Sequence, residues 1–451
     1  MGGSASRAIA VVGRYRYALT MGRPDHPQQI IRHYLLFRFL QDFALIYPVY
    51  AIMFRNAGLN YKDIGLLFAI WAGAVMVLEI PSGFLADLWS RRGTVSIALL
   101  LKAAGFLLWW MHPTFAGFAA GFVLWGFQEA LSSGTTEALL FDPLKAGGQE
   151  HEFVRASGLG MLLARIAVGL AMVLGAWVFS RSEAWALGLS VVAMVGAAAV
   201  VLRIPDIRLS PDGAGDAETP IGGTLTPRVE SPSRRIITTV RSAARVPGLV
   251  ALVLFGAFGT AVYGVLDEFD ALFARFHGVP VAWIGVWGLV RLTGEGVGGW
   301  FAPRLARIIR LRAVRRGARS RIDARRESAG LERGIAGWVA AASLLLAAGT
   351  VFGSRVLLPL YFVYYAMMAA AEVLYHAEVQ HRIESSGRAT VASIVSSVYT
   401  AAGMGQILLF GWVADRWSIA MIFPVGAVLS ATAAAGYLGW HRARSHASPP
   451  A

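Results

Sequence analysis

Residues 61–88 read YKDIGLLFAIWAGAVMVLEIPSGFLADL, and they decide the fold class. This stretch is mostly apolar, and a helix of about 20 such residues crosses the roughly 30 Å hydrocarbon core of a bilayer. Comparable runs lie at 34–54, 93–112, 114–144, 153–181, 183–203, 247–276, 280–306, 335–353, 356–383, 388–414 and 418–440. Together they make twelve, so we expect an all-α integral membrane protein with twelve transmembrane helices.

The composition points to the same class and excludes several kinds of chemistry. Hydrophobic residues make up 56% of the 451 residues and charged residues 15%, whereas charged residues are about 25% of a soluble domain. The chain has no cysteine, which excludes disulfides and thiolate metal sites. It has no Walker A sequence, His-Glu-x-x-His motif or nucleophile elbow. We therefore predict neither an ATP-driven pump nor an enzyme, and no metal or cofactor.

The basic residues indicate topology. The net charge is +14, and most of this charge lies in loops between apolar runs, which favours a lipid bilayer over nucleic acid as the partner. Because Lys and Arg keep short loops in the cytoplasm, we expect both termini to be cytoplasmic in a bacterial inner membrane. The expected units are an N-terminal tail (1–33), a six-helix bundle (34–203), a linker (204–246), a second six-helix bundle (247–440) and a C-terminal tail (441–451).

Repeated segments suggest that the two bundles are related. Gly58-Leu-Asn-Tyr-Lys-Asp-Ile-Gly65 opens the second span, and Gly278-Val-Pro-Val-Ala-Trp-Ile-Gly285 opens the eighth. The same spans end on an E-x-x-x-G-x-x-A pattern beginning at Glu79 and Glu295, and a third partial copy begins at Gly411. We interpret these matches as duplication. The alternative is chance, because small-residue patterns are common in membrane helices.

The segment Gly83-Phe-Leu-Ala-Asp87-Leu-Trp-Ser-Arg91-Arg92 resembles motif A of the major facilitator superfamily, G-x-L-a-D-[RK]-x-G-R-[RK]. Leu88 and Ser90 depart from the pattern, in which a base and a glycine are usual. The resemblance covers residues 34–440. It implies two pseudo-symmetric six-helix bundles, secondary transport by alternating access, no cofactor and a monomer.

The same resemblance assigns gating roles near this motif. It implies that Asp87 caps a helix of the other half, and that Arg91 pairs with an acid at the cytoplasmic end of span four, here Asp142. Such a latch would hold the outward-facing state. Gly83 and Arg92 complete the motif.

Charged residues inside the spans are the candidate site. Such a residue costs at least roughly 2.5–3.5 kcal/mol at bilayer depth and usually faces a partner or a cavity. The candidates for a substrate cavity are Arg38, Lys102, Arg165, Arg291 and Glu295. Internal ion pairs are the alternative, since Arg291 and Glu295, like Arg38 and Asp42, stand four apart on one helix face. Glu129 and Arg165 could pair across helices.

Three acids in span seven are the leading candidates for proton coupling. Asp267, Glu268 and Asp270 have one base nearby in the sequence, Arg275. A desolvated carboxyl in a cavity can take up and release protons near neutral pH, and Asp42 and Glu129 are further candidates. The alternative is that the three acids lie solvated and inert at the outer mouth.

Aromatic residues could line a cavity for a planar or amphipathic compound. Those considered are Trp109, Trp110, Trp125, Tyr361, Tyr364 and Tyr365, for which packing or an interface position is the alternative. The resulting functional hypothesis is proton-coupled export of a small organic or amphipathic compound. Proton-linked uptake of a nutrient such as a sugar or organic acid is the rival, and a transport-inactive sensor or a membrane-embedded enzyme are the rivals of another class.

Overall fold

The computed structural model describes the backbone of residues 27–207, 246, 248–314, 323–352, 354–383 and 388–447. Side chains at 80–88, 312–328, 350–358, 384–390 and 444–447 lie outside the description. The first half comprises α2 (Pro27–Asp42), α3 (Tyr50–Asn56), α4 (Tyr61–Leu88), α5 (Arg91–Met111), α6 (Phe115–Ser132), α7 (Thr135–Ala146), η1 (Glu150–Glu152), α8 (Phe153–Phe179) and α9 (Glu183–Val201). The second half comprises α11 (Leu249–Phe255), η3 (Gly256–Thr260), α12 (Val262–Asp267), α13 (Asp270–Phe276), α14 (Val281–Val314), α15 (Asp323–Phe352), α16 (Ser354–Arg382), α17 (Arg388–Arg416), η4 (Ile419–Met421) and α18 (Ile422–Ala447).

These helices make the twelve expected crossings, but three crossings are broken. Among the residues that the structure describes, eight helices are long and apolar enough to cross a membrane by length and composition alone. The breaks lie between α2 and α3, between α6 and α7, and within the run from α11 to α13. The expectation of one continuous helix over 34–54, 114–144 and 247–276 is therefore wrong in these three places. A glycine explains the second break, because Gly134 adopts φ +71, which side chains disfavour.

Several helices also extend beyond the expected spans. Helix α2 begins at Pro27, before the expected start at 34, and α14 continues to Val314 rather than 306. Helix α15 begins at Asp323, before the expected start at 335. Helical ends of this kind carry the spans past the apolar core, so hydropathy underestimated their length.

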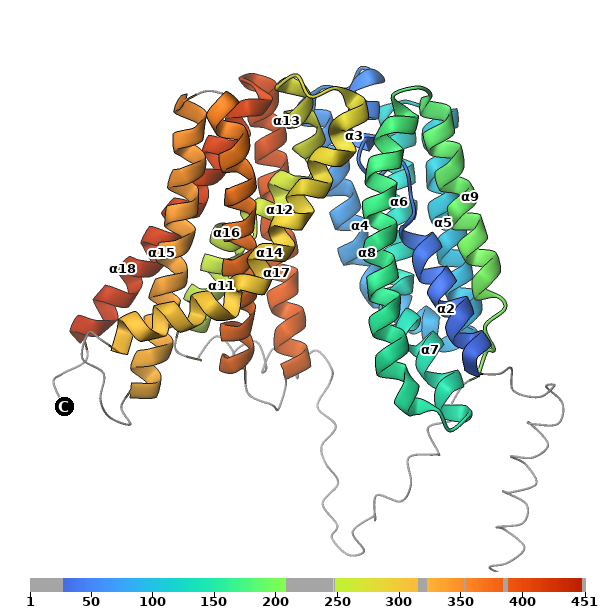
Figure 1. Cartoon of the computed structure of the whole chain (residues 1–451), viewed down its shortest axis with the longest axis horizontal. Coiled ribbons are helices and arrows are strands. Elements are labelled where there is room, and N and C mark those ends of the chain that lie inside the picture. Colours follow the sequence, from blue (N-terminus) through green and yellow to red (C-terminus); the bar gives the residue numbers. More distant parts are fainter. Residues whose placement is uncertain are drawn as a thin grey trace, which may run out of the picture.

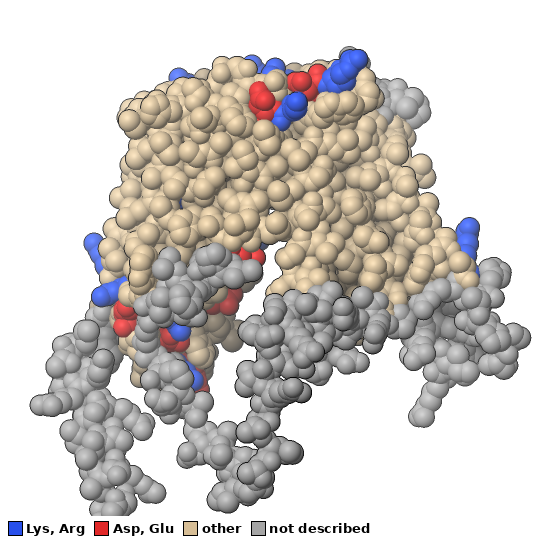
Figure 2. Space-filling model, turned by 180° about the vertical axis from the view of Figure 1, so that it is seen from behind, with Lys and Arg blue, Asp and Glu red and all other residues tan. Residues whose placement is uncertain are grey.

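The two halves lean together on one side and part on the other (Figure 1). They meet on the side of α3 and α13, which we call the far side. They separate on the side where α2 begins and α18 ends, which we call the terminal side. Figure 2 shows the hollow between the halves opening on the terminal side. Aromatic rings fill each half, as in the pairs Phe54–Phe118 (centroids 4.5 Å apart) and Phe273–Phe423 (3.9 Å).

The repeated segments have the same structure in both halves. Gly58 and Gly278 adopt φ +92 and +83, a region in which glycine is strongly favoured. At both, the glycine amide donates to the carbonyl three residues earlier at 3.0 Å, and the next amide donates to the carbonyl five residues earlier at 3.2 and 3.0 Å. The match is therefore a shared helix-ending turn.

The second glycine of each repeat lies where the halves cross. A methyl group on Gly65 of α4 would lie 3.0 Å from the Ile407 carbonyl oxygen and 3.1 Å from Gly411 Cα, both on α17. A methyl group on Gly285 of α14 would overlap the Met172 carbonyl oxygen on α8. Small residues thus let two pairs of helices approach closely across the halves. Gly411, from the third partial copy, belongs to the first crossing.

Candidate functional site

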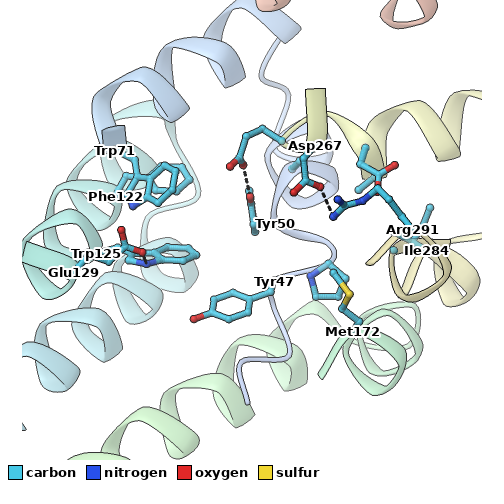
Figure 3. A pocket seen from close by; sticks show the side chains of 16 residues that line it. Tyr47, Tyr50, Trp71, Phe122, Trp125, Glu129, Met172, Asp267, Ile284 and Arg291 are labelled. Carbon is cyan, nitrogen blue, oxygen red and sulfur yellow. Dashed lines mark hydrogen bonds and ion pairs between the residues drawn. The ribbon is translucent and has the colours of Figure 1, made fainter. Parts of the chain in front are cut away.

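A cavity of about 330 Å³ lies between the two halves. Two of the broken crossings reach it, with Tyr47 and Tyr50 at the α2–α3 break and Asp267 and Glu268 at the α12–α13 break. Figure 3 shows aromatic side chains of the first half facing the charged side chains of the second. Discontinuous helices commonly form such sites in transporters, because broken turns bring polar groups to the middle of the membrane.

Arg291 on α14 is the centre of the charged wall. Its Nε donates to Asp270 Oδ2 at 3.0 Å, and its two terminal nitrogens pair with Asp267 and Glu295. Asp270 also accepts hydrogen bonds from Trp287 at 2.5 Å and from the Tyr361 hydroxyl. One guanidinium therefore serves three carboxylates in a buried place, an arrangement that is costly unless every partner is satisfied.

This cluster bears on two points that the sequence left open. The base that pairs with the span-seven acids is Arg291, whereas Arg275 is exposed. The acids line the central cavity rather than an outer mouth, and Asp270 is only 6% exposed. The expected pair of Arg291 with Glu295 does form, but as one part of the larger cluster.

The third acid joins the halves. The Tyr50 hydroxyl of the first half donates to Glu268 Oε2 of the second at 2.6 Å. Beside it, the rings of Phe68 and Phe269 meet edge to face with centroids 5.6 Å apart. These contacts close the far side of the cavity.

The aromatic wall holds a second, covered base. Lys102 is 4% exposed, and its Nζ donates to the Tyr47 hydroxyl at 2.6 Å. The same Nζ lies 4.3 Å from the Trp125 ring centroid, within the range of a cation–π contact. Glu129 accepts a hydrogen bond from Trp125 Nε1 at 2.9 Å, whereas Arg165, the partner considered for it, is exposed.

The cavity therefore gathers part of the predicted set. Glu129, Asp267, Glu268, Asp270 and Arg291 line it, and Glu295 joins through Arg291. Arg38, Asp42, Lys102 and Arg165 are not among the lining residues, and Arg38 pairs with Asp42 at 3.9 Å.

Most of the aromatic lining was missed. Of the aromatic residues considered, Trp125 lines the cavity and Tyr361 contacts Asp270. The sequence reading did not find Tyr47, Tyr50 and Trp71. Pro48 was the available signal for the two tyrosines, because a proline inside an apolar span breaks the helix and exposes its neighbours.

A second cavity of about 270 Å³ lies nearer the terminal side and shares Glu129 with the first. Glu79 of α4 and the hydroxyls of Ser133, Ser396, Ser397 and Thr400 also line it. The shared glutamate places the two cavities next to each other. Together they reach from the cluster around Arg291 toward the open side of the molecule.

The motif between α4 and α5 has its own local structure. Arg91 pairs with Asp142, whose side chain is 7% exposed. Ser90, which departs from the motif's glycine, caps α5 by accepting the Gly93 amide at 3.0 Å, an interaction typical of helix N-termini. Both ends of the ion pair lie in the first half, so this pair alone does not join the halves. Gly83 and Asp87 lie outside the described side chains, and the latch stays a prediction.

Known proteins resemble this chain in sequence pattern and in architecture. The Major Facilitator Superfamily model matches residues 35–315, and no curated protein matches the sequence. The nucleoside transporter NupG has a TM-score of 0.64 at 14% identity, covering 92% of this chain and 98% of its own. A bacterial homolog to the human lysosomal transporter Spinster, inward-facing and unoccupied, has a TM-score of 0.62 at 16% identity, covering 93% and 98%. A D-xylose-proton symporter has a TM-score of 0.56 at 10% identity, covering 91% and 96%.

The structural likenesses are below 25% identity and show the fold of a membrane transporter. The family match covers more than half of the chain. It confirms the resemblance first drawn from the segment Gly83 to Arg92. This chain belongs to the major facilitator superfamily.

Proposed function

We propose that this protein couples protons to the export of a small organic or amphipathic compound. The observation that carries the proposal is the cluster in which one base of the described part of the chain, Arg291, pairs with Asp267, Asp270 and Glu295. With all three acids ionised the cluster has an excess of negative charge inside the bilayer, where such charge is expensive. Binding a proton removes part of that cost, and releasing it restores the charge for a new partner.

Alternating access supplies the transport cycle. In this structure the far side is closed by the Tyr50–Glu268 hydrogen bond and by the glycine crossings, while the terminal side is open (Figures 1 and 2). Rocking of one half against the other about the fixed cavity would reverse these conditions. We assign the terminal side to the bacterial cytoplasm from the basic loops, which makes this the inward-facing state.

The test uses purified protein in liposomes that contain a pH-sensitive dye. A compound panel is added with and without an imposed pH gradient, and proton movement and compound flux are recorded together. A transported compound should move protons, and Asp267→Asn should reduce this movement to the level of empty liposomes. Glu150→Gln is the matched control, because Glu150 is exposed in the short η1 helix.

The outcomes separate the rival readings. Compound flux that ignores the gradient and moves no protons would contradict the coupling. Accumulation in right-side-out vesicles, rather than in everted ones, would reverse the direction to uptake. Absence of flux for every compound and both orientations would favour a transport-inactive protein.

A further inference from the structure

Each half brings a buried base and at least one acid to the region of the central cavity. In the second half, Arg291 is 4% exposed, whereas 39% of the Asp267 side chain is exposed. In the first half, Lys102 is 4% exposed and does not line the cavity, whereas Glu129 does. Each half thus brings an acid to the cavity, but the two bases differ, because Arg291 also lines the cavity and Lys102 does not. Figure 3 shows Asp267 on the side of Arg291 that faces the aromatic wall.

The lining of the cavity carries more acids than bases, although the whole chain does not, and the ammonium of Lys102 lies behind it at 4.3 Å from the Trp125 ring centroid. Four carboxylates and one guanidinium line it: Glu129, Asp267, Glu268, Asp270 and Arg291. The chain carries +14 overall, so the reversal is local to this place. An excess of carboxylate in a desolvated space attracts a positive ligand and repels an anion.

The aromatic wall adds a surface for a flat apolar body. Trp125 stacks on Tyr47 and Phe122 with centroids 5.3 and 5.8 Å apart, and Trp71 lies 6.0 Å away. Trp125 already holds the ammonium of Lys102 at 4.3 Å from its ring centroid. The buried indole nitrogen of Trp71 has no hydrogen-bond partner among the residues that the structure describes. Aromatic faces attract cations when water is excluded.

We propose that the substrate is an organic cation with a flat apolar portion, bound between Trp125 with Glu129 on one side and Asp267 with Glu268 on the other. This inference rests on the proposed transport function and narrows it to a substrate class. A cavity of about 330 Å³ is at the small end of ligand pockets, which span about 300–1,000 Å³. It suits one or two fused rings carrying an ammonium group. The repulsion of carboxylates disfavours organic acids.

The test compares three ligands that share one ring system and differ in charge: naphthylmethylammonium, naphthylmethanol and naphthoate. Binding to the full-length protein in lipid nanodiscs is measured by calorimetry at one fixed pH, with empty nanodiscs subtracted. The cation should bind about tenfold more tightly than the alcohol, as expected for one desolvated charge interaction. Naphthoate should bind least.

Variants locate the effect in the proposed site. Glu129→Gln and Asp267→Asn should each weaken binding of the cation about tenfold and leave binding of the alcohol nearly unchanged. Retained alcohol binding shows that these variants are folded. Trp125→Leu should weaken both, because the ring surface is lost, and Glu150→Gln should change neither.

Three results would overturn the inference: no advantage of the cation over the alcohol, preference for naphthoate, or cation binding that ignores both acid substitutions. The binding assay uses no pH gradient, so it is independent of coupling. Cation binding without proton movement in liposomes would contradict the proposed function but would still support the cation-binding site. Proton-coupled flux of neutral compounds alone would support the proposed function and contradict the cation site.

Discussion

At the scale of single residues, Arg291 is bound by more acids than it can neutralise. Its guanidinium contacts Asp267, Asp270 and Glu295 while almost completely buried. Removing one partner from a buried ionic group typically costs about 3–5 kcal/mol, because the remaining charges are left unpaired. The planar fork of arginine also matches carboxylates in a way that a lysine ammonium does not.

We therefore expect Arg291→Gln to destabilise the protein and abolish transport. The free energy of unfolding should fall by about 3–5 kcal/mol, as for other broken buried pairs, measured by thermal unfolding in detergent. Arg291→Lys should recover part of the stability. A double variant that also carries Asp270→Asn should unfold at a higher temperature than Arg291→Gln alone. Equal stability of Arg291→Gln and the parent would contradict the account.

Tyr50 gives a second prediction, on the closed side of the cavity. Tyr50→Phe removes the 2.6 Å hydrogen bond to Glu268 of the other half, and a bond to a charged group contributes about 1.5–3 kcal/mol. Far-side opening should then become at least about tenfold more frequent.

The readout for Tyr50→Phe uses the absence of native cysteine in this chain. A single Ala271→Cys in the cavity should react faster with a thiol reagent applied from the far side. Tyr61→Phe is the control, because the Tyr61 ring contacts Arg55 at 4.5 Å on the same side. An unchanged labelling rate would mean that the Tyr50 hydroxyl does not hold the far side closed.

At the scale of elements, the twelve spans and the repeated turns were predictable because hydropathy and glycine patterns are local in sequence. The breaks in the helices were harder to predict, since Pro48 and Gly134 were the only local signals for them. The pairing of side chains within the cavity could not be predicted from residues that are close in sequence. Arg291 and Asp270 are 21 residues apart, and Tyr50 and Glu268 are 218 apart. Such pairs depend on how helices pack, so the nearest base in sequence, Arg275, did not indicate the actual partner, Arg291.

The crossing of α8 and α14 gives a prediction for a single methyl group. Gly285→Ala would place its methyl group on the Met172 carbonyl oxygen, whereas a methyl group on Gly296 of the same helix meets nothing within 4 Å. Gly285→Ala should lower the unfolding temperature or force the halves apart. Gly296→Ala should be neutral or stabilising by up to about 1 kcal/mol, from helix propensity.

Thermal unfolding of both glycine variants provides the measurement, and far-side labelling of Ala271→Cys reports any opening. Identical behaviour of the two variants would show that the crossing tolerates the extra atom. The close approach of α8 and α14 would then not limit the contact between the halves.

At the scale of the whole molecule, the open and closed sides define which compartment this conformation serves. The basic loops predict that the terminal side faces the cytoplasm. Single cysteines at Asn56 and Glu150, both exposed and on opposite sides, test this in intact cells. A thiol reagent that cannot cross the membrane should label Asn56→Cys only. Labelling of Glu150→Cys alone would invert the topology and with it the direction of transport.

The excess of acids over bases in the cavity lining has a further consequence for coupling. A proton and an ammonium group would neutralise the same carboxylates, and each carboxylate accepts one of them at a time. The cavity would then bind protons and organic cations competitively at a few fixed carboxylates, as a weak cation exchanger does. Exchange stoichiometry would follow from competition for these sites, without any signal passing between distant parts of the protein.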